Sequence, residues 1–300
     1  MKNIVFLFIF FCISTHAQIN RFFYEYKFIP DSKNKQEVKT EMMLLDIDQK
    51  GSNYYSRDKF VADSTSMAEV QKQIKGGSGN INISRRDNSG QVGYKVTKSY
   101  PDFKTYLFTR ISMDEYKVKE DKKPEWKILP EKQKIGEYNT QKATTSYGGR
   151  AWIAWFTTDI PFQDGPYKFY GLPGLIVRLE DTTGSHMMTL VGNKKMAAPV
   201  ASEEMDVPGN VRIMGLGGKE LEISRDQYKK LWKDYVNDPS KNMREMMMRN
   251  GSDNTRVSFK VRTQDGKEIS DPNQVFREME KRTKESLAKN NNPIEPDLVK

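Results

Sequence analysis

The sequence predicts an α+β fold: a curved antiparallel β-sheet, either a sandwich or a half-open barrel, with helices from the C-terminal third packed on it. Two observations predict it. In the first two-thirds of the chain, short segments of apolar or alternating residues recur at intervals of roughly 8–12 residues with turn residues between them, which is typical of antiparallel β-structure. After residue 224, apolar residues recur at helical spacing instead.

The strands are predicted from apolar runs and from alternation. Tyr24, Tyr26 and Phe28 alternate with charged residues, which places three aromatic side chains on one face of a strand. Further short strands are predicted at residues 42–47, 94–96, 103–108, 116–118 and 126–129. Apolar residues at helical spacing interrupt this pattern between residues 64 and 75 and predict a short helix there.

Capping residues mark the predicted helices of the last third. Ser224 is a typical N-cap before a helix that ends near residue 238, and a second helix is predicted from there to about residue 250. Asp271 is a cap followed by proline at the first helical position, which predicts a third helix that ends near residue 289.

The domain organisation follows from these elements. We expect one domain over residues 18–290, in which residues 135–196 carry the motifs and residues 224–290 are mainly helical. Residues 291–300 follow a polar segment and are predicted to form a disordered tail.

Residues 1–17 have the pattern of a secretory signal peptide. After a positively charged start, residues 4–13 form an unbroken apolar run, and the segment ends on the small residue Ala17, as cleavage requires. The run is too short for a membrane-spanning helix, which needs about 20 residues. Cys12 lies inside the apolar run, which is not the position of a lipidated cysteine. We therefore expect a periplasmic, outer-membrane-associated or secreted protein that is not a lipoprotein.

Composition then excludes several kinds of chemistry. Cleavage after Ala17 would remove the single cysteine and one of the two histidines, and would leave His186. Such a chain has no disulfide, no thiol nucleophile and no thiolate or multi-histidine metal site. We predict no cofactor and no catalytic residue. The net charge of +9 is dispersed and no basic-aromatic motif is present, so nucleic acid is not a predicted partner.

The segment 135–196 is unlike the rest of the chain. Residues 151–156 are apolar on both faces of a predicted strand, with Trp152 on one face and Trp155 on the other, so this strand is buried on both sides or lines a groove. Three prolines and three glycines follow in the 18 residues from Asp159 to Ile176, together with four aromatic residues. This composition predicts an ordered loop that packs on the core.

The loop ends in a predicted turn. Leu172-Pro173-Gly174-Leu175 fits a type II turn, because proline presets the first central position and glycine supplies the positive φ of the second. A hairpin is predicted after it, with strands at residues 175–180 and 186–191.

Residues 171–176 read Gly-Leu-Pro-Gly-Leu-Ile, and the chain resembles the GLPGLI family of exported Bacteroidetes proteins, which this signature names. The resemblance extends to residues 142–145, 149–150, 154–157, 160–161 and 164–169, and more weakly to 223–239. Family members often carry a cysteine near the position of Thr140. The resemblance implies an exported envelope protein of a Gram-negative bacterium and carries over no catalytic residues.

Residues 150–174 are the predicted binding site, for an apolar or amphipathic ligand or for an envelope partner such as an outer-membrane transporter. The residues predicted to form it are Arg150, Trp152, Trp155, Asp159, Asp164, Tyr167, Lys168, Phe169, Gly171, Leu172, Pro173 and Gly174. The alternative interpretation is that these residues form a packed structural core with one buried ion pair.

Two further functions stay open at this point. Asp159, Asp164, Glu180 and Asp181 lie near aromatic residues, and a pair of them could hydrolyse glycosides if two carboxylates converged roughly 5–9.5 Å apart. Methionine thioethers are ligands for Cu(I), although methionine at helical spacing is more often core filler. The methionines concerned are Met187, Met188, Met243, Met246, Met247 and Met248.

Overall fold

The computed structural model describes residues 18–76, 90–112, 114–197, 220–250, 261–262 and 266–299. The predicted signal peptide lies outside these residues. Within them, none of the helices combines the length and the apolar character that crossing a membrane requires.

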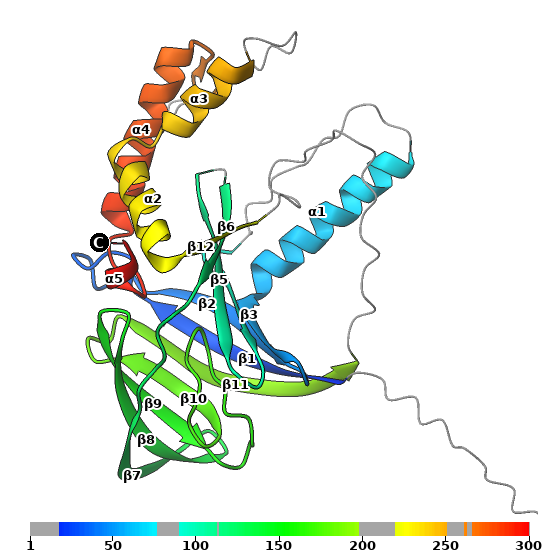
Figure 1. The fold of residues 1–300 in the computed structure, drawn as a ribbon, viewed down its shortest axis with the longest axis vertical. Coiled ribbons are helices and arrows are strands. Elements are labelled where there is room, and N and C mark those ends of the chain that lie inside the picture. Colours follow the sequence, from blue (N-terminus) through cyan, green and yellow to red (C-terminus); the bar gives the residue numbers. More distant parts are fainter. Residues whose placement is uncertain are drawn as a thin grey trace, which may run out of the picture.

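Twelve strands form one open sheet in the order β12-β6-β5-β4-β3-β2-β1-β11-β10-β9-β8-β7 (Figure 1). They are β1 (Gln18–Phe28), β2 (Lys39–Ile47), β3 (Gly51–Ser56), β4 (Lys95–Ser99), β5 (Lys104–Ile111), β6 (Asp114–Lys119), β7 (Lys127–Ile135), β8 (Tyr138–Tyr147), β9 (Arg150–Thr157), β10 (Leu175–Asp181), β11 (His186–Ala197) and β12 (Leu221–Ser224). Neighbours are antiparallel except β12 and β6, which are parallel. The predicted α+β fold with a curved antiparallel sheet is confirmed.

In the described part of the chain, the remaining elements are five helices and a small strand pair. The helices are α1 (Arg57–Lys75), α2 (Arg225–Asn237), α3 (Lys241–Asn250), α4 (Pro272–Lys289) and α5 (Pro296–Val299). The strand pair is β13 (Val261–Arg262) and β14 (Glu268–Ile269). Figure 1 shows α2, α3 and α4 grouped beyond one end of the sheet, while α1 projects away from β2 and β3.

The core lies on the inner face of the sheet. Tyr24 and Tyr26 of β1 are buried there, as their alternation with charged residues predicts. The loop between β9 and β10 packs onto the same face, where the Phe162 ring lies 5.8 Å from the Phe22 ring. Directly after the loop, at the start of β10, the Ile176 carbonyl oxygen accepts from the Tyr24 hydroxyl at 2.7 Å. The loop therefore fills the concave side of the sheet.

The predicted caps are confirmed. Ser224 and Gln227 form a reciprocal capping box at α2, and the Asp271 carboxylate accepts from the backbone N–H of Gln274 at α4. Helix α1 begins earlier than the predicted residue 64, because the Ser56 hydroxyl accepts from the backbone N–H of Lys59 at 3.1 Å and so caps a longer helix.

The end of the chain differs from its prediction. Residues 291–299 are not disordered but cross the end of the sheet, where the Asn292 side chain donates to the Ile29 carbonyl oxygen at 2.8 Å. Glu295 is 2% exposed and Leu298 is 4% exposed. The polar composition of this segment predicted disorder. The partners of its charges lie in distant parts of the chain, so the local sequence does not reveal that the segment is ordered.

Candidate functional site

Most aromatic residues of segment 150–174 belong to the core or pack against it, whereas Trp155 does not. Trp152, Tyr167, Phe169 and Leu172 are each at most 1% exposed. The Phe169 ring lies 5.0 Å from the Trp152 ring and 5.2 Å from the Tyr147 ring. These side chains contact one another and leave no surface for a ligand in this conformation, which favours the packed-core interpretation.

The rest of the predicted site does not form one groove either. Trp155 lies on the opposite face of β9 from Trp152, with Lys142 Nζ 5.9 Å from its ring centroid. Asp159, Gly171 and Pro173 are exposed, Arg150 is partly buried, and Asp164 and Lys168 are buried. The twelve predicted residues are thus divided between the core and separate parts of the surface.

The turn at the end of the loop brings two backbone segments into contact. The backbone N–H of Gly174 donates to the Leu172 carbonyl oxygen at 2.8 Å, which makes a three-residue turn around Pro173 in place of the predicted type II turn. Gly174 has the predicted positive φ, at 148°. A Cβ atom on Gly174 would lie 1.9 Å from the Thr157 carbonyl oxygen, so only glycine fits between this turn and the end of β9.

Asp164 fixes the middle of the loop to β4. Its carboxylate forms an ion pair with Lys98, and both side chains are fully buried. The Tyr100 hydroxyl donates to Asp164 Oδ2 at 2.5 Å, and Lys98 Nζ also donates to the Gly165 carbonyl oxygen at 2.7 Å. Burial lowers the pKa of Lys98, whereas the Asp164 charge opposes that shift. The partner Lys98 could not be identified from the sequence.

Lys168 belongs to a buried charge cluster, defined as Glu120, Lys168, Arg225 and Glu295. Lys168 Nζ lies 2.6 Å from Glu120 Oε2 and 2.5 Å from Glu295 Oε1. Arg225 Nη1 lies 2.9 Å and 2.7 Å from the same two carboxylates. All four side chains are at most 4% exposed. Two cations and two anions from four distant segments therefore pair with one another inside the protein, and Arg225 Nη2 also pairs with Asp297 Oδ1 at 2.6 Å.

Arg150 is the centre of a third polar group. Its Nη1 atom donates to Asp181 Oδ2 at 2.9 Å, and its Nη2 atom donates to the Pro293 carbonyl oxygen at 2.7 Å. The backbone N–H of His186 donates to Asp181 Oδ1 at 2.8 Å, and the Tyr26 hydroxyl lies 2.7 Å from His186 Nδ1. These contacts join β9, β10, β11 and the C-terminal segment.

We predict that the free energy of unfolding decreases as the pH falls from 6.5 to about 4, because of His186. Burial, and then the charge of Arg150, lower the pKa of His186 to about 4 from its ordinary 6.5. Between these values the unfolded chain binds a proton that the folded protein does not, so stability falls as pH decreases through this window, by up to about 3 kcal/mol. Urea denaturation at several pH values measures this slope.

Replacing His186 with a residue that does not titrate isolates its contribution to the pH dependence of stability. His186→Asn keeps an acceptor for Tyr26 and should flatten the slope between pH 6.5 and pH 4. Because His186 is the only histidine after residue 17, no second histidine can replace its contribution. An unchanged slope in the variant would contradict the prediction.

The carboxylates of the hydrolase alternative have separate partners. Asp164 is paired with Lys98, Asp181 with Arg150, and Glu180 with Arg178 at 2.8 Å. The two aspartates are buried, whereas Asp159 is exposed. No pair among them is presented together to a substrate.

The methionines of the copper alternative lie apart. Met188 is fully buried in the core, and Met187, its neighbour on β11, is on the opposite face, where its sulfur accepts from Arg178 at 3.1 Å. Met243 lies on α3, and the side chains of residues 246–248 are outside the described part of the chain. The described methionines thus do not share a site.

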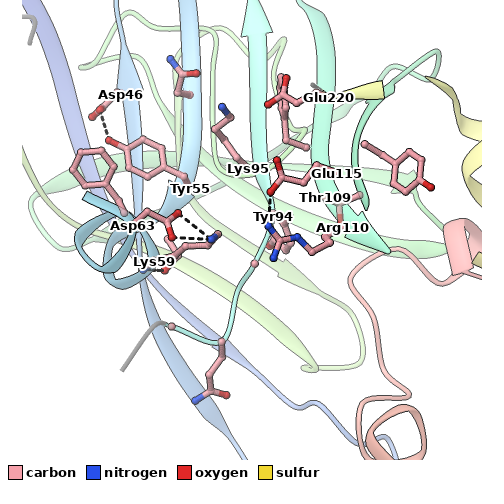
Figure 2. A pocket seen from close by; sticks show the side chains of 18 of the residues that line it. Asp46, Tyr55, Lys59, Asp63, Tyr94, Lys95, Thr109, Arg110, Glu115 and Glu220 are labelled. Carbon is pink, nitrogen blue, oxygen red and sulfur yellow. Dashed lines mark hydrogen bonds and ion pairs between the residues drawn. The ribbon is translucent and has the colours of Figure 1, made fainter. Parts of the chain in front are cut away.

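A cavity of about 750 Å³ lies on the outer face of the sheet beside α1 (Figure 2). Its lining comes from α1, from β2 to β6 and from the segment before β4. Figure 2 shows Lys59 and Asp63 on the α1 side of the cavity, and Arg110 and Glu115 on the strand side. No residue of this cavity belongs to the segment that the sequence indicated.

Aromatic side chains form part of the lining. The Tyr55 ring lies 5.3 Å from the Phe60 ring, and Phe108 lines the cavity from β5. Tyr55 is held in place because its hydroxyl donates to Asp46 Oδ2 at 2.6 Å, and Asp46 in turn accepts two 2.7 Å bonds from Arg21. Phe60 is 47% exposed, so a large part of its ring is accessible.

The charges in the cavity are partly paired. Lys59 Nζ lies 2.9 Å from Asp63 Oδ2 on α1, and Arg110 is paired with Glu115. Lys95 Nζ lies 4.3 Å from the Phe108 ring centroid, where the ring face attracts the cation. The cavity can therefore offer aromatic surface and one ammonium group that has no carboxylate partner among the described residues.

Comparison with known proteins gives a match to a family of unknown function over part of the chain and a distant likeness to solved structures. No curated protein matches the chain. Two solved structures of PNGF-II, in space groups C2 and P21, align with 72% of this chain at 16% identity, with TM-scores of 0.45 and 0.44. The chain spans about a third of the length of these structures, 32% and 33%. Residues 149–178, which include the loop and turn described above, match the model of a family described as a protein of unknown function (Porph_ging), and this match does not confirm the GLPGLI name.

Proposed function

We propose that the chain is a non-enzymatic binding protein whose ligand occupies the cavity beside α1. The supporting observation is that accessible aromatic rings of Tyr55, Phe60 and Phe108 gather in a concavity of about 750 Å³. Ligand sites in proteins are typically clefts of roughly 300–1,000 Å³ with aromatic linings and a few polar groups. An apolar or amphipathic ligand is the class that fits such a lining.

In this proposal residues 150–174 support the site but do not bind the ligand. The loop fills the inner face of the sheet, and the cavity lies on the outer face. Lys98 and Lys95 lie on the same strand, β4, and point to opposite faces, the first towards Asp164 and the second into the cavity. Packing of the loop thus holds the strand that presents Lys95.

We predict that truncation of Phe60 weakens the binding of an apolar probe. The protein is used in its processed form, without the N-terminal segment. Nile red is titrated into it, and its fluorescence should show saturable binding. Phe60→Ala should raise its dissociation constant about fivefold, because loss of part of a ring contact costs about 1 kcal/mol.

A matched control separates this effect from surface hydrophobicity. Val38 is 53% exposed and does not line the cavity, so Val38→Ala should leave the dissociation constant unchanged. Non-saturable binding, or equal effects of the two substitutions, would contradict the proposed site.

Export is the second part of the proposal. The apolar run before Ala17 supports cleavage at that position and release into the envelope or the medium. We expect N-terminal sequencing of the protein from the native host to begin at Gln18. Recovery of the chain with Met1 intact would overturn this part.

A further inference from the structure

Residues 291–299, called here the C-terminal segment, cross the end of the sheet, and no described strand pairs with them. The segment follows α4, and its last residues form α5, which lies against α2 (Figure 1). Its backbone is attached at Asn292, whose N–H donates to the Pro30 carbonyl oxygen at 3.0 Å, and at Asp297, whose N–H donates to the Gly148 carbonyl oxygen at 3.3 Å. The segment therefore attaches to the end of the sheet as a bound peptide would.

The buried charge cluster depends on this segment for its balance of charge. Lys168 Nζ lies 2.5 Å from Glu295 Oε1, and Arg225 lies 2.7 Å from Glu295 Oε2 and 2.6 Å from Asp297 Oδ1. Without the segment, these two cations would keep only Glu120 from the cluster. Because an unbalanced charge in a buried place is unfavourable, the site favours a ligand that brings a carboxylate.

Arg150 contacts the start of the segment. Its Nη2 atom donates to Asn292 Oδ1 at 2.6 Å and to the Pro293 carbonyl oxygen at 2.7 Å. On its other side the guanidinium is held by Asp181 at 2.9 Å, and Asp181 also accepts from the backbone N–H of His186. The contacts that position Arg150 thus include partners in β10 and β11 that do not belong to the segment.

The turn between β8 and β9 lets the segment approach closely. A Cβ atom on Gly148 would lie 2.6 Å from Glu295 Cγ, and one on Gly149 would lie 3.2 Å from the Asp297 backbone nitrogen. A second cavity of about 750 Å³ borders this turn and is lined in part by Asp297 and by residues before β7. The site therefore continues beyond the surface that the segment covers.

We propose that Gly148, Gly149, Arg150, Lys168 and Arg225 form a binding site for an acidic peptide, called here the acceptor site, and that the C-terminal segment is its detachable ligand. The ligand class is a peptide in which a glutamate follows an Asn-Pro pair by two residues, as in Asn292-Pro293-Ile294-Glu295. The pair is recognised at Arg150, and the glutamate lies between the two buried cations. The proposal is independent of the cavity beside α1, whose lining includes no residue of the acceptor site.

A protein cut between Asn290 and Asn291 tests the proposal. The full chain is folded with a specific protease site inserted at this position, directly after the end of α4, and is cut afterwards. A fluorescein-labelled peptide of residues 291–299 is then added in excess. We expect fluorescence anisotropy to show saturable binding to the cut protein. Binding to the uncut protein should be at least about a hundredfold weaker, because the attached segment competes at a high effective concentration.

Two substitutions in the peptide remove one negative charge each and differ in the burial of that charge. The side chain of Glu295 is 2% exposed, whereas that of Asp297 is 27% exposed. The peptide with Glu295→Gln should bind about tenfold more weakly, and the peptide with Asp297→Asn at most about threefold more weakly. Equal losses would mean that net charge alone attracts the peptide, and would overturn the acceptor site.

Two glycine variants of the cut protein locate the peptide on the sheet. Gly148→Ala should weaken the peptide about tenfold, because the new Cβ atom meets Glu295. The matched control is Gly136→Ala, in the turn between β7 and β8. Gly136 has a similar φ, 58° against 67° for Gly148, but nothing within 4 Å of a built Cβ atom, so this variant should leave binding unchanged.

His186 shows whether the segment can leave a folded protein. It is 2% exposed, its ring lies beside the backbone of Asn292 and Pro293, and it is the only histidine after residue 17. Its modification by diethyl pyrocarbonate should be slow in the uncut protein, faster once the cut segment has been washed out, and slow again after the peptide is added. Near-ultraviolet circular dichroism should be retained throughout.

The remaining outcomes would overturn the proposal. A cut protein that binds no labelled peptide has no exchangeable ligand. A cut protein that loses its near-ultraviolet signal when the segment is washed out, and does not regain it with the peptide, would show that the segment is an integral part of the fold.

Discussion

Lys168→Met is expected to lower the free energy of unfolding by about 3–5 kcal/mol, because it leaves buried carboxylates without one of their two cations. Arg225, which also pairs with Asp297, would then be the only cation left to Glu120 and Glu295, whose side chains are 2% exposed. A buried carboxylate that loses its cation cannot recover the interaction from water. Urea denaturation followed by circular dichroism measures the loss.

The pH dependence of this loss identifies its electrostatic origin. Burial raises the pKa of Glu295, but the charges of Lys168 and Arg225 outweigh it and hold that pKa below its ordinary value. The stability from ionised Glu295 is therefore present above the ordinary glutamate pKa and is lost as pH falls through the lowered value. Removal of Lys168 allows Glu295 to bind a proton at higher pH, so the difference between variant and wild type should shrink below about pH 4.3.

An exposed lysine in contact with the same segment is the matched control. Lys122 Nζ lies 3.0 Å from Asp297 Oδ2, but its side chain is 52% exposed. Lys122→Met should cost about 1 kcal/mol or less, as exposed ion pairs do. Equal costs for the two substitutions would show that the buried charge cluster contributes no more than a surface pair.

Much of the fold follows from local patterns. Alternation around Tyr24 and Tyr26 predicts β1, and the caps Ser224 and Asp271 locate α2 and α4. Strand pairing could not be predicted in this way. β1 lies between β2 and β11, and β11 comes from a distant part of the sequence. Local periodicity determines which residues face the core but carries no information on which strand lies next to which.

The candidate site was harder to predict for the same reason. The composition of residues 150–174 predicts an ordered loop on the core, and the burial of Trp152 and Phe169 agrees with it. The choice between groove and core depends on partners such as Lys98 and Glu295, which only the tertiary structure brings to the loop.

No local pattern in the sequence was strong enough to predict the cavity beside α1. Strand register places Lys95 opposite Phe108, and Phe60 reaches the same cavity from α1. Phe60 is seven residues before Met67, so it continues the apolar stripe of α1 beyond the predicted start of the helix. This continuation is the one feature that could have directed attention to the cavity.

The two glycines of the turn segment give the second large prediction, since they differ in what surrounds them. Gly171 has a φ of 93° and nothing within 4 Å of a built Cβ atom, whereas Gly174 has a φ of 148° and the Thr157 carbonyl oxygen at 1.9 Å. Gly171→Ala should therefore cost only backbone strain, about 1–3 kcal/mol. Gly174→Ala adds a clash with backbone that no side-chain rotation can relieve, and should cost more than about 4 kcal/mol.

Both variants are compared by urea denaturation, with recovery of soluble protein as a second measure for Gly174→Ala. The large cost is expected because separation of the turn from β9 would also strain the bond between the Leu175 N–H and the Ile160 carbonyl oxygen, 3.1 Å long. Similar costs for the two alanines would mean that the close approach at Thr157 can relax, and that positive φ alone selects glycine at both positions. A much larger cost at Gly174 would instead assign the second glycine of the Gly-Leu-Pro-Gly segment to the contact between the loop and the sheet.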